Sequence, residues 1–313
     1  DQSAPYWKSE SDSQIIIGQD FRILAASKRG RSHAHVGSFR DDDYLIRQLP
    51  DSGWSLAIVA DGAGSARYSR RGSQLVCREA DYHLQKTLGG AEGLAIAMAS
   101  EAFYRLQQEP VDAAQLEMAR KTLHNALYVT VGHAAYHAVK AIHAEIAVQP
   151  DLDASYKDFS TTALIAICRR FDFGVLCAAY WVGDGAVGVY RQGQEIRLLG
   201  DVDSGEFSGQ TRFLDATEVS QEALLKRTRF ELVDDLTSLV LMTDGVSDPK
   251  FETDARLART AAWDELWLDL DQAVGLTVKA GGAEQRLLSW FDFWSPGNHD
   301  DRTIALILPE ATT

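Results

Sequence analysis

Short apolar stretches rich in branched residues occur near both ends of the chain, and each is bounded by Gly, Asp or Pro. Stretches of this kind are typical of buried or half-buried β-strands. Near the start they predict strands at residues 14–18, 21–27, 43–49 and 54–60. In the second half they predict further strands at residues 161–170, 173–183, 186–193, 195–200, 229–233, 238–243 and 302–308.

Between these two groups lies a long segment in which apolar residues recur at helical spacing. It runs from about Ser69 to Val148, and two later helical segments are expected near 261–279 and 282–293. Strands that cluster on both sides of a helical block, without alternating one for one with helices, disfavour a doubly wound parallel sheet. The predicted fold class is therefore α+β, with two packed, mainly antiparallel β-sheets flanked by helices.

The distribution of the predicted strands also bears on domain organisation. Because core strands are expected from both ends of the chain, residues 1–313 are expected to form a single domain. The polar start, up to about residue 14, is expected to be an extension of that domain. A mobile flap is expected over about 199–228, because residues 199–214 are rich in glycine and polar residues.

Composition and charge exclude several classes of protein. The chain has 31 basic and 45 acidic residues and a net charge of -14, which disfavours nucleic acid as a partner because phosphate contacts need a basic surface. Its three cysteines suit neither a disulfide framework nor a zinc knuckle, and indicate reduced packing residues in a cytoplasmic protein. No apolar run reaches the length of a membrane span, and the first residues do not resemble a signal peptide. A cytoplasmic protein without a membrane partner is expected.

Acidic residues stand where several predicted strands begin or end. The strand at 54–60 runs into Asp61-Gly62, and the strand at 238–243 runs into Asp244-Gly245. Two more acidic groups, 41–43 and 300–301, precede the strands at 43–49 and 302–308. Mg²⁺ and Mn²⁺ prefer a few convergent oxygen ligands and retain several waters. These strand ends therefore predict a divalent metal site.

The Asp-Gly pairs have two other interpretations. Asp-Gly is a common turn dipeptide, and Gly183-Asp184-Gly185, which lies between two predicted strands, is typical of a hairpin turn with a structural acid. Asp61 is followed by a helix instead, which weakens the hairpin interpretation there. A dinucleotide-binding loop is also disfavoured, because Arg67 occupies the third glycine position and Asp61 would repel a pyrophosphate.

The acidic motifs resemble those of a known family. The segments FRDDDYLI, AIVADGAGS, KDFSTTALIAI, YWVGDGAVGVYRQGQEIRLL, LMTDGVSD and HDDRTIALI are similar, in the same order, to motifs of the PPM-type (type 2C) metal-dependent protein Ser/Thr phosphatases. The resemblance covers about Ala26 to Leu308, and GEFSGQTRFL and TDGVSDP are most similar to a divergent bacterial branch. It implies an α-β-β-α sandwich.

The resemblance also implies roles for particular residues. Asp61 would bridge two Mn²⁺ or Mg²⁺ ions, with the Gly62 carbonyl contributing to one of them. Asp244 and Asp300 would complete the first site. Asp41 stands where the family's Glu binds the second ion, with Asp42 as its alternative, and Asp158 would hold a third ion shared with Asp244.

Two positions depart from the family pattern. The phosphate-binding Arg of many relatives is replaced by Gly37, and the His that follows Asp-Gly in eukaryotic members is replaced by Ala63. The candidates to bind the substrate phosphate instead are His33, His35 and Arg40, of which His33 is preferred because its segment directly precedes the acids.

The activity implied is hydrolysis of phosphoserine and phosphothreonine on proteins by a water that bridges two Mn²⁺ or Mg²⁺ ions. The implied partners are a phosphorylated protein substrate and, by family analogy, a cognate Ser/Thr kinase. Two alternatives remain open: a catalytically weak or inactive binding module, and a small-molecule phosphohydrolase that uses the same metals. His133 and His137 have zinc-ligand spacing, but Ala134 stands where a zinc protease needs its Glu, so helix packing is favoured.

Overall fold

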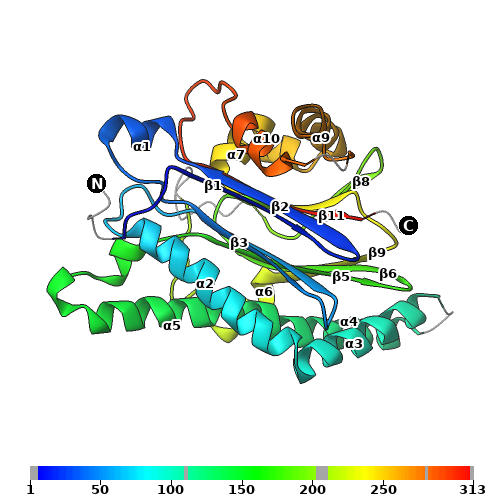
Figure 1. Ribbon diagram of the computed structural model, residues 1–313. Helices are drawn as coiled ribbons and strands as arrows, with labels where there is room; N and C mark the ends of the chain where they lie inside the picture. Colours follow the sequence, from blue (N-terminus) through cyan, green and yellow to red (C-terminus); the bar gives the residue numbers. More distant parts are fainter. Residues whose placement is uncertain (1–5, 109–111, 202–210, 279–280, 311–313) are drawn as a thin grey trace.

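Two antiparallel β-sheets, stacked face to face, form the centre of the protein (Figure 1). The structure is a computed structural model and describes residues 6–108, 112–201, 211–278 and 281–310. The first sheet has the order β1 (Ser11–Ile17), β2 (Phe21–Lys28), β11 (Arg302–Pro309), β10 (Ser238–Met242), β7 (Ala186–Arg191) and β8 (Glu195–Leu198). The second has the order β3 (Asp43–Leu49), β4 (Trp54–Ala60), β5 (Ala163–Phe171), β6 (Gly174–Val182) and β9 (Thr228–Val233).

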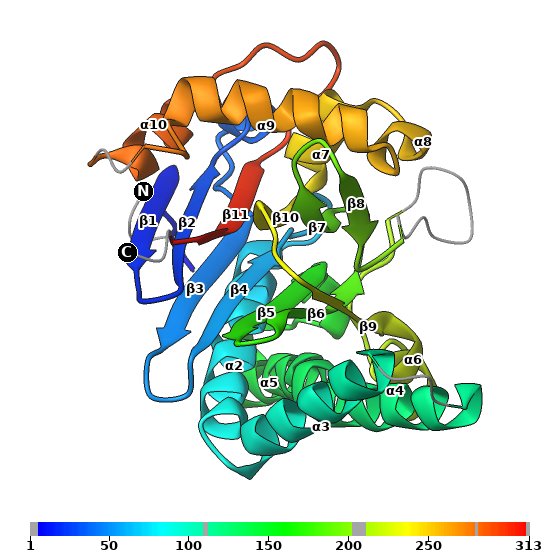
Figure 2. The same ribbon diagram turned by 90° about the vertical axis from the view of Figure 1, so that its right-hand side faces the viewer.

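Helices cover the outer face of each sheet, so the layers follow the order α-β-β-α (Figure 2). The second sheet is covered by α2 (Ser69–Leu88), α3 (Ala91–Gln108), α4 (Ala113–Leu127) and α5 (His133–Val148), with a π-helical turn, η1 (Tyr128–Gly132), between the last two. The first sheet is covered by α7 (Asp244–Phe251), α8 (Asp254–Leu257), α9 (Thr260–Val274) and α10 (Ala283–Trp290). The predicted fold class is thus confirmed.

The strand pattern arises from burial on both faces of each sheet. Along β4, Leu56 and Ile58 face the helices, whereas Ala57 and Val59 pack between the two sheets. Because alternate residues of a strand point to opposite faces, a strand buried on both sides must be apolar throughout. This explains the uninterrupted apolar run that ends at Asp61.

Several short elements were not predicted. They are α1 (Arg31–Val36), α6 (Gln221–Arg227), η2 (Pro150–Leu152) and η3 (Tyr156–Phe159), together with α7 and α8. The polar start is shorter than expected, because β1 already begins at Ser11. Part of the expected flap is helical, since it contains α6, and residues 202–210 of that flap lie outside the described residues. Among the residues described, every helix is too short or too polar to cross a bilayer.

The predicted hairpin at Gly183-Asp184-Gly185 is wrong, because β6 and β7 belong to different sheets. The segment crosses from one sheet to the other. Gly183 adopts φ +121°, and a Cβ there would lie 2.6 Å from the side chain of Thr162. The crossing brings Asp184 to the edge of the sandwich where both sheets end.

That edge also collects the other acids. Asp43 pairs with Ala60 in the second sheet, and Met242 pairs with Ile304 in the first. Because neighbouring antiparallel strands run in opposite directions, the start of one strand lies beside the end of the next. Acids that are distant in the sequence therefore meet at one end of the molecule.

Candidate metal centre

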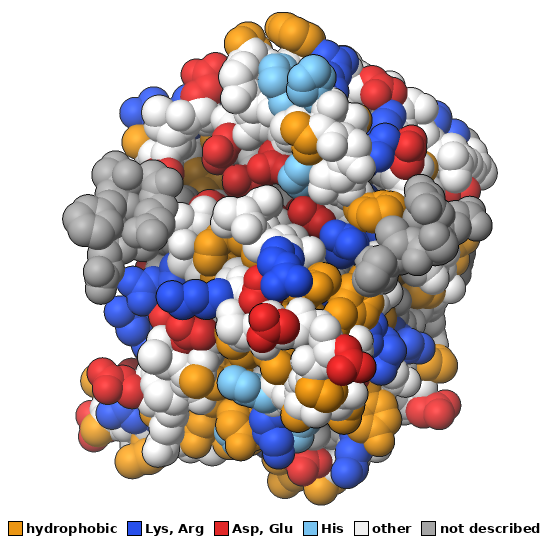
Figure 3. Space-filling model, turned by 90° about the vertical axis from the view of Figure 1, so that its left-hand side faces the viewer, with side chains coloured by type: hydrophobic (Ala, Val, Ile, Leu, Met, Phe, Trp, Pro, Cys, Tyr) orange, Lys and Arg blue, Asp and Glu red, His pale blue; other side chains and the backbone are white. Residues whose placement is uncertain are grey.

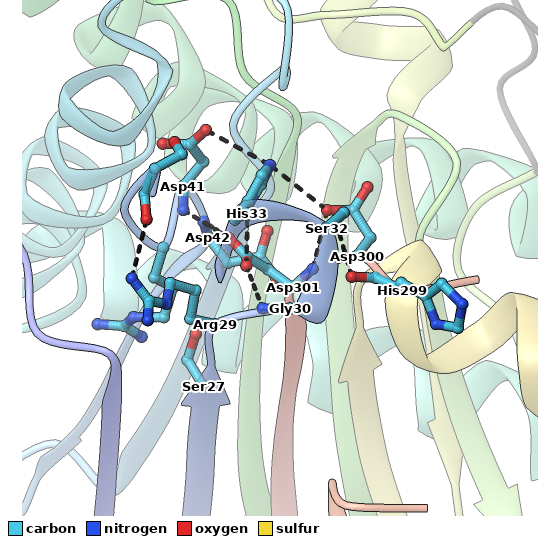
Figure 4. Close-up of polar contacts among 12 residues, drawn as sticks. Ser27, Arg29, Gly30, Ser32, His33, Asp41, Asp42, His299, Asp300 and Asp301 are labelled. Atoms are coloured by element: carbon cyan, nitrogen blue, oxygen red, sulfur yellow. Dashed lines mark hydrogen bonds and ion pairs between the residues drawn. The ribbon is translucent and has the colours of Figure 1, made fainter. Parts of the chain in front are cut away.

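Five carboxylates gather at this end and are here called the acidic centre: Asp41, Asp61, Asp184, Asp244 and Asp300. Oxygen atoms of Asp61, Asp184 and Asp244 all lie within 4.8 Å of one another. His33 Nε2 lies 3.8 Å from Asp41 Oδ2 and 3.9 Å from Asp300 Oδ1, which places these two acids on either side of the imidazole (Figure 4). Figure 3 shows acidic side chains gathered in a hollow of this face.

Asp61 is fixed by the end of β4 and by two threonines of the neighbouring segment. Its backbone N–H donates to Thr162 Oγ1 at 2.8 Å, and its carbonyl accepts from the Thr162 N–H at 2.7 Å. The Thr161 hydroxyl donates to the same carbonyl at 2.9 Å. With its backbone groups satisfied, the Asp61 carboxylate is free to project into the acidic centre.

The glycine after each of two acids permits a close approach of the backbone. A Cβ on Gly62 would lie 2.7 Å from the carbonyl oxygen of Asp41, and a Cβ on Gly245 would lie 1.8 Å from that of Asp301. Neither approach is compatible with a larger residue. At both Asp-Gly pairs, 61–62 and 244–245, the glycine therefore packs against the backbone of another segment of the site. A simple turn would not require this packing.

Asp184 belongs to the acidic centre, although the sequence indicated a structural turn acid. The Thr211 hydroxyl donates a hydrogen bond to its carboxylate. The hairpin interpretation concealed this placement, because a turn within one sheet would have kept Asp184 away from Asp61 and Asp244. The signal available in the sequence was only the acid between two strands.

The acids destabilise one another's charged forms. Burial, followed by the charges of nearby acids, raises the pKa of Asp61 and raises that of Asp244 to about 7. Burial likewise raises the pKa of Asp41 to about 6, against the opposing effect of His33. Positive charge placed among these carboxylates would offset this repulsion.

Two carboxylate oxygens of the acidic centre also stand out among the described residues. Asp41 Oδ1 and Asp244 Oδ1 are buried and have no hydrogen-bond partner among the described residues. Buried carboxylate oxygens are normally paired or bound to a metal. Hard oxygen donors with a surplus of negative charge suit Mn²⁺ or Mg²⁺, so the residues present fit the predicted ions.

His33 is held in the acidic centre by Asp301. Its Nδ1 lies 2.9 Å from Asp301 Oδ1, and this hydrogen bond is the largest of the effects that raise the pKa of His33 to about 9. Asp301 also accepts from the backbone N–H groups of Gly30 at 2.6 Å and Asp41 at 2.5 Å. The structure thus places the preferred candidate, His33, with Nε2 facing the acids.

Asp42 does not replace Asp41 in this arrangement. Its carboxylate is buried and accepts from the hydroxyls of Thr243 at 3.0 Å and Thr303 at 2.7 Å. These bonds tie the segment before β3 to β10 and β11.

Two further expectations do not agree with the structure. Arg40 is buried, and its Nε donates to the Ser9 carbonyl at 3.3 Å, so its side chain is directed to the N-terminal segment and not to the acids.

Asp158 accepts from the backbone N–H of Ser155 at 2.8 Å and lies 3.9 Å from Arg67, where it caps η3. Ser155 and Arg67 are the residues that lower its pKa, and no member of the acidic centre acts on it. His35 is exposed on α1.

Gly37, which the resemblance sets at the position of the family Arg, lies in a left-handed turn. Gly37 ends α1 with φ +73°, a conformation that strains any residue with a Cβ. An Arg at this position would disfavour the turn that places His33.

Sequence reasoning also missed Lys8. Its Nζ donates to the Asp42 carbonyl at 2.7 Å and lies 3.1 Å from Asp43 Oδ2. Burial lowers the pKa of Lys8, and the ion pair with Asp43 opposes that effect. Lys8 therefore holds the segment of Asp42 and Asp43 in place. Its polar surroundings in the sequence had indicated only an N-terminal extension.

Comparisons with known proteins identify the family. The model of the family described as protein phosphatase 2C matches residues 29–291, and a comparison with curated proteins finds no match. Among solved structures, the chain is similar to the catalytic domain of the Ser/Thr protein phosphatase PstP in complex with 2 manganese ions (18% identity, 93% of this chain and 99% of that chain covered, TM-score 0.49). It is also similar to RsbX in complex with magnesium (13%, 96% and 100%, TM-score 0.44) and to the Ser/Thr phosphatase Stp1 from Staphylococcus aureus (14%, 95% and 98%, TM-score 0.46). Because the family model spans most of its length, the chain belongs to the protein phosphatase 2C family of metal-dependent protein Ser/Thr phosphatases.

Proposed function

We propose that the acidic centre of this chain holds Mn²⁺ or Mg²⁺ and hydrolyses phosphoserine and phosphothreonine on proteins. The observation that carries the proposal is the convergence of carboxylates, two of which have buried oxygens without a hydrogen-bond partner among the described residues. Asp61, Asp184 and Asp244 would hold one ion. Asp41, together with Asp61 and the Gly62 carbonyl, would hold the second ion. Asp300 would be a further metal ligand. Asp158 is left out, because it caps η3.

The bound ions would activate a water molecule and offset charge on the transferring phosphoryl group. The protein's own task is to present the carboxylates without rearrangement. Thr161 and Thr162 fix the backbone of Asp61, and Asp301 joins the segments that carry His33 and Asp41. Pre-organised groups of this kind lower the cost of reaching the transition state.

We further propose that His33 supplies the proton for the leaving alkoxide. Nδ1 is engaged with Asp301, and this hydrogen bond favours the protonated imidazole, so the Nε2–H faces the acidic centre. A Cβ on Gly64 would lie 3.5 Å from Nε2, which places this nitrogen beside the loop that follows Asp61. Ala63, in that loop, has no proton to give. His33 can also donate to a phosphate oxygen, as a family Arg would.

The first test is hydrolysis of an aryl phosphate with Mn²⁺, with a chelator, and by the Asp61→Asn variant. Activity is expected with Mn²⁺ only, and D61N should lose at least about 100-fold in kcat, because a ligand shared by both ions is removed. Full activity in D61N would contradict the assignment. Bound metal without hydrolysis of any phosphate ester would indicate the binding module instead.

The role of His33 is tested by the dependence on the leaving group. A phosphothreonine peptide releases a poor alkoxide leaving group and needs a proton, whereas an aryl phosphate releases a stable phenolate. His33→Gln should therefore lose about 100-fold in kcat on the peptide and less than about tenfold on the aryl phosphate. Equal losses on both substrates would assign His33 to phosphate binding and not to proton transfer.

The cellular setting follows by analogy. A phosphatase of this kind acts in opposition to a Ser/Thr kinase, and we propose a bacterial, cytoplasmic signalling pair. Three buried cysteines, all free, are compatible with a reducing compartment. Co-purification with a kinase whose autophosphorylated form the protein dephosphorylates would test the pairing.

A further inference from the structure

A pocket of opposite charge adjoins the acidic centre. It is lined by the end of β2 and the start of α1, by the segment after α10, and by the start of β11. Its charged residues are Lys28, Arg29, Arg31, Asp292, Asp300 and Arg302. Asp300 borders both the pocket and the acidic centre. A substrate bound at the centre can therefore extend into this pocket, here called the basic pocket.

The basic pocket carries positive charge in a chain whose net charge is -14. Most of its cations already have a partner. Lys28 pairs with Asp292 at 2.7 Å, Arg29 pairs with Glu10 at 2.7 Å, and Arg302 donates to the Phe293 carbonyl at 2.8 Å. Arg31 differs, because no acidic side chain among the described residues lies within ion-pair distance of it.

Arg31 instead makes a cation–π contact with an exposed aromatic ring. Its guanidinium lies 5.1 Å from the centre of the Trp294 ring, and the His299 ring lies 5.7 Å from the same ring. Trp294 is 69% exposed, although a side chain of this size is usually covered. Exposed Trp and Arg side chains are the residue types most enriched in the energetic centres of protein interfaces.

The pocket is joined to the catalytic groups by α1. Arg31 and His33 both belong to this helix. Ser32, between them, binds the His299 carbonyl through its backbone N–H at 3.0 Å and through its hydroxyl at 2.7 Å (Figure 4). The distance from Arg31 to the acidic centre is therefore set by hydrogen-bonded backbone and not by a free loop.

From this geometry we infer that the basic pocket binds an acidic side chain of the protein substrate close to its phosphorylated residue, with Arg31 as the ion-pair partner and Trp294 as the surface on which the substrate backbone lies. The inference rests on the proposed function and adds a preference in sequence. An Arg that has no acidic partner among the described residues, and that lies beside a site for a dianionic ester, attracts substrates that carry further negative charge nearby.

The test compares phosphothreonine peptides that differ only near the phosphorylated residue, with Glu, Gln or Lys at positions one to three residues away. The wild-type protein with Mn²⁺ is expected to show a kcat/KM about tenfold higher for the best Glu peptide than for the matching Gln peptide. Arg31→Ala should reduce that ratio to about one. Arg31→Glu should make the Lys peptide a better substrate than the Glu peptide. A salt concentration of about 0.5 M should reduce the wild-type ratio, since exposed charges are screened.

The matched control is Arg105→Ala, which removes an exposed Arg from α3. It should keep the wild-type preference for the Glu peptide. A peptide with a second phosphoserine in place of Glu shows whether the pocket takes a phosphoryl group better than a carboxylate. Equal kcat/KM for the Glu and Gln peptides in the wild type, or an unchanged preference in R31E, would overturn the inference.

Failure of the proposed function has a different signature. If the wild-type protein does not hydrolyse even the aryl phosphate, the assignment of the acidic centre to catalysis fails. The basic pocket is then tested by fluorescence anisotropy with labelled peptides and Mn²⁺. Tighter binding of the Glu peptide by the wild type, lost in R31A, would support the pocket, and equal binding would reject it.

Discussion

Two acids of this chain, Asp158 and Asp184, show how a residue's role depends on the strand ends around it. Both stand in motifs that resemble family motifs; the resemblance implied a metal at Asp158, and the residue pattern indicated a turn at Asp184. In the structure Asp184 lies with Asp61 and Asp244, whereas Asp158 closes a turn with Ser155. The difference is physical: Asp184 follows a strand that leaves one sheet for the other, and Asp158 lies in a 3₁₀ turn that satisfies its carboxylate locally.

These two residues give a matched pair of variants. Asp184→Asn is expected to raise the Mn²⁺ concentration needed for half-maximal activity by at least about tenfold, because one charged ligand is lost. Asp158→Asn should leave that concentration unchanged, since its carboxylate serves only η3. Metal titrations of aryl phosphate hydrolysis measure both values. A larger effect from Asp158 than from Asp184 would restore the third-ion assignment.

At the scale of elements, a short helix carries residues of the candidate site, whereas the long helices α2 to α5 cover the second sheet. α1 is six residues long and buries none of them, so hydrophobic periodicity gives no sign of it. It nevertheless carries both His33 and Arg31. The long helices α2 and α5 were predictable from periodicity, and they meet at a histidine contact in which His83 and His137 stack with ring centres 4.4 Å apart.

This contact predicts a loss of stability in acid. Burial, followed by the charges of His137 and His133, lowers the pKa of His83 to about 4. The unfolded chain, with a His pKa of about 6.5, then binds more protons than the folded chain between pH 6.5 and 4, so the free energy of unfolding falls as the pH falls through this window. The expected contribution between pH 7 and pH 5 is about 1 kcal/mol after allowance for partial exposure.

Urea unfolding of the wild type and of His83→Phe at both pH values isolates this contribution. Phe keeps a ring against His137 but cannot titrate, so H83F should lose less stability in acid than the wild type. All other acids and bases are common to the two proteins. Identical pH dependence in both would show that His83 is not the responsible group.

At the scale of the whole molecule, the acids at one end of the sandwich repel one another when they are charged, and bound cations would reduce this repulsion. Without metal, the raised pKa values of Asp41 (about 6) and Asp244 (about 7) mean that the folded state binds protons more tightly than the unfolded state does. Their contribution to stability is therefore lost as the pH rises from about 4 to about 7. Metal binding replaces protons with cations, and so its effect should grow over the same range.

Thermal unfolding with chelator or with Mn²⁺ tests this expectation. Mn²⁺ at about 100 times its Kd at pH 7.5 should stabilise the protein by about 2.7 kcal/mol at that pH, and the same Mn²⁺ concentration should give a smaller rise in Tm at pH 5.5. D61N should show a much smaller rise at both pH values. A Tm that does not respond to Mn²⁺, or that responds equally at both pH values, would contradict a metal-linked acidic centre.

Local sequence pattern was enough to predict the layers of the protein and its most informative acids. Strands buried on both faces must be apolar throughout, so an acid that ends such a strand stands out, and local pattern alone indicated Asp61 and Asp244 as candidate ligands, together with the acidic groups 41–43 and 300–301. The resemblance singled out Asp41 and Asp300 within these groups, and it correctly indicated the family. His33 was selected because it stands just before the acids.

Which side chains lie together became clear from the three-dimensional structure. It moved Asp184 into the acidic centre, kept Asp158 and Arg40 out of it, and revealed Lys8 and Asp301 as supports. These outcomes depend on which sheet a strand joins and on contacts between segments up to about 270 residues apart, such as His33 with Asp301. Hydrophobic periodicity records the burial of each segment, but it carries no information about which segment becomes its neighbour.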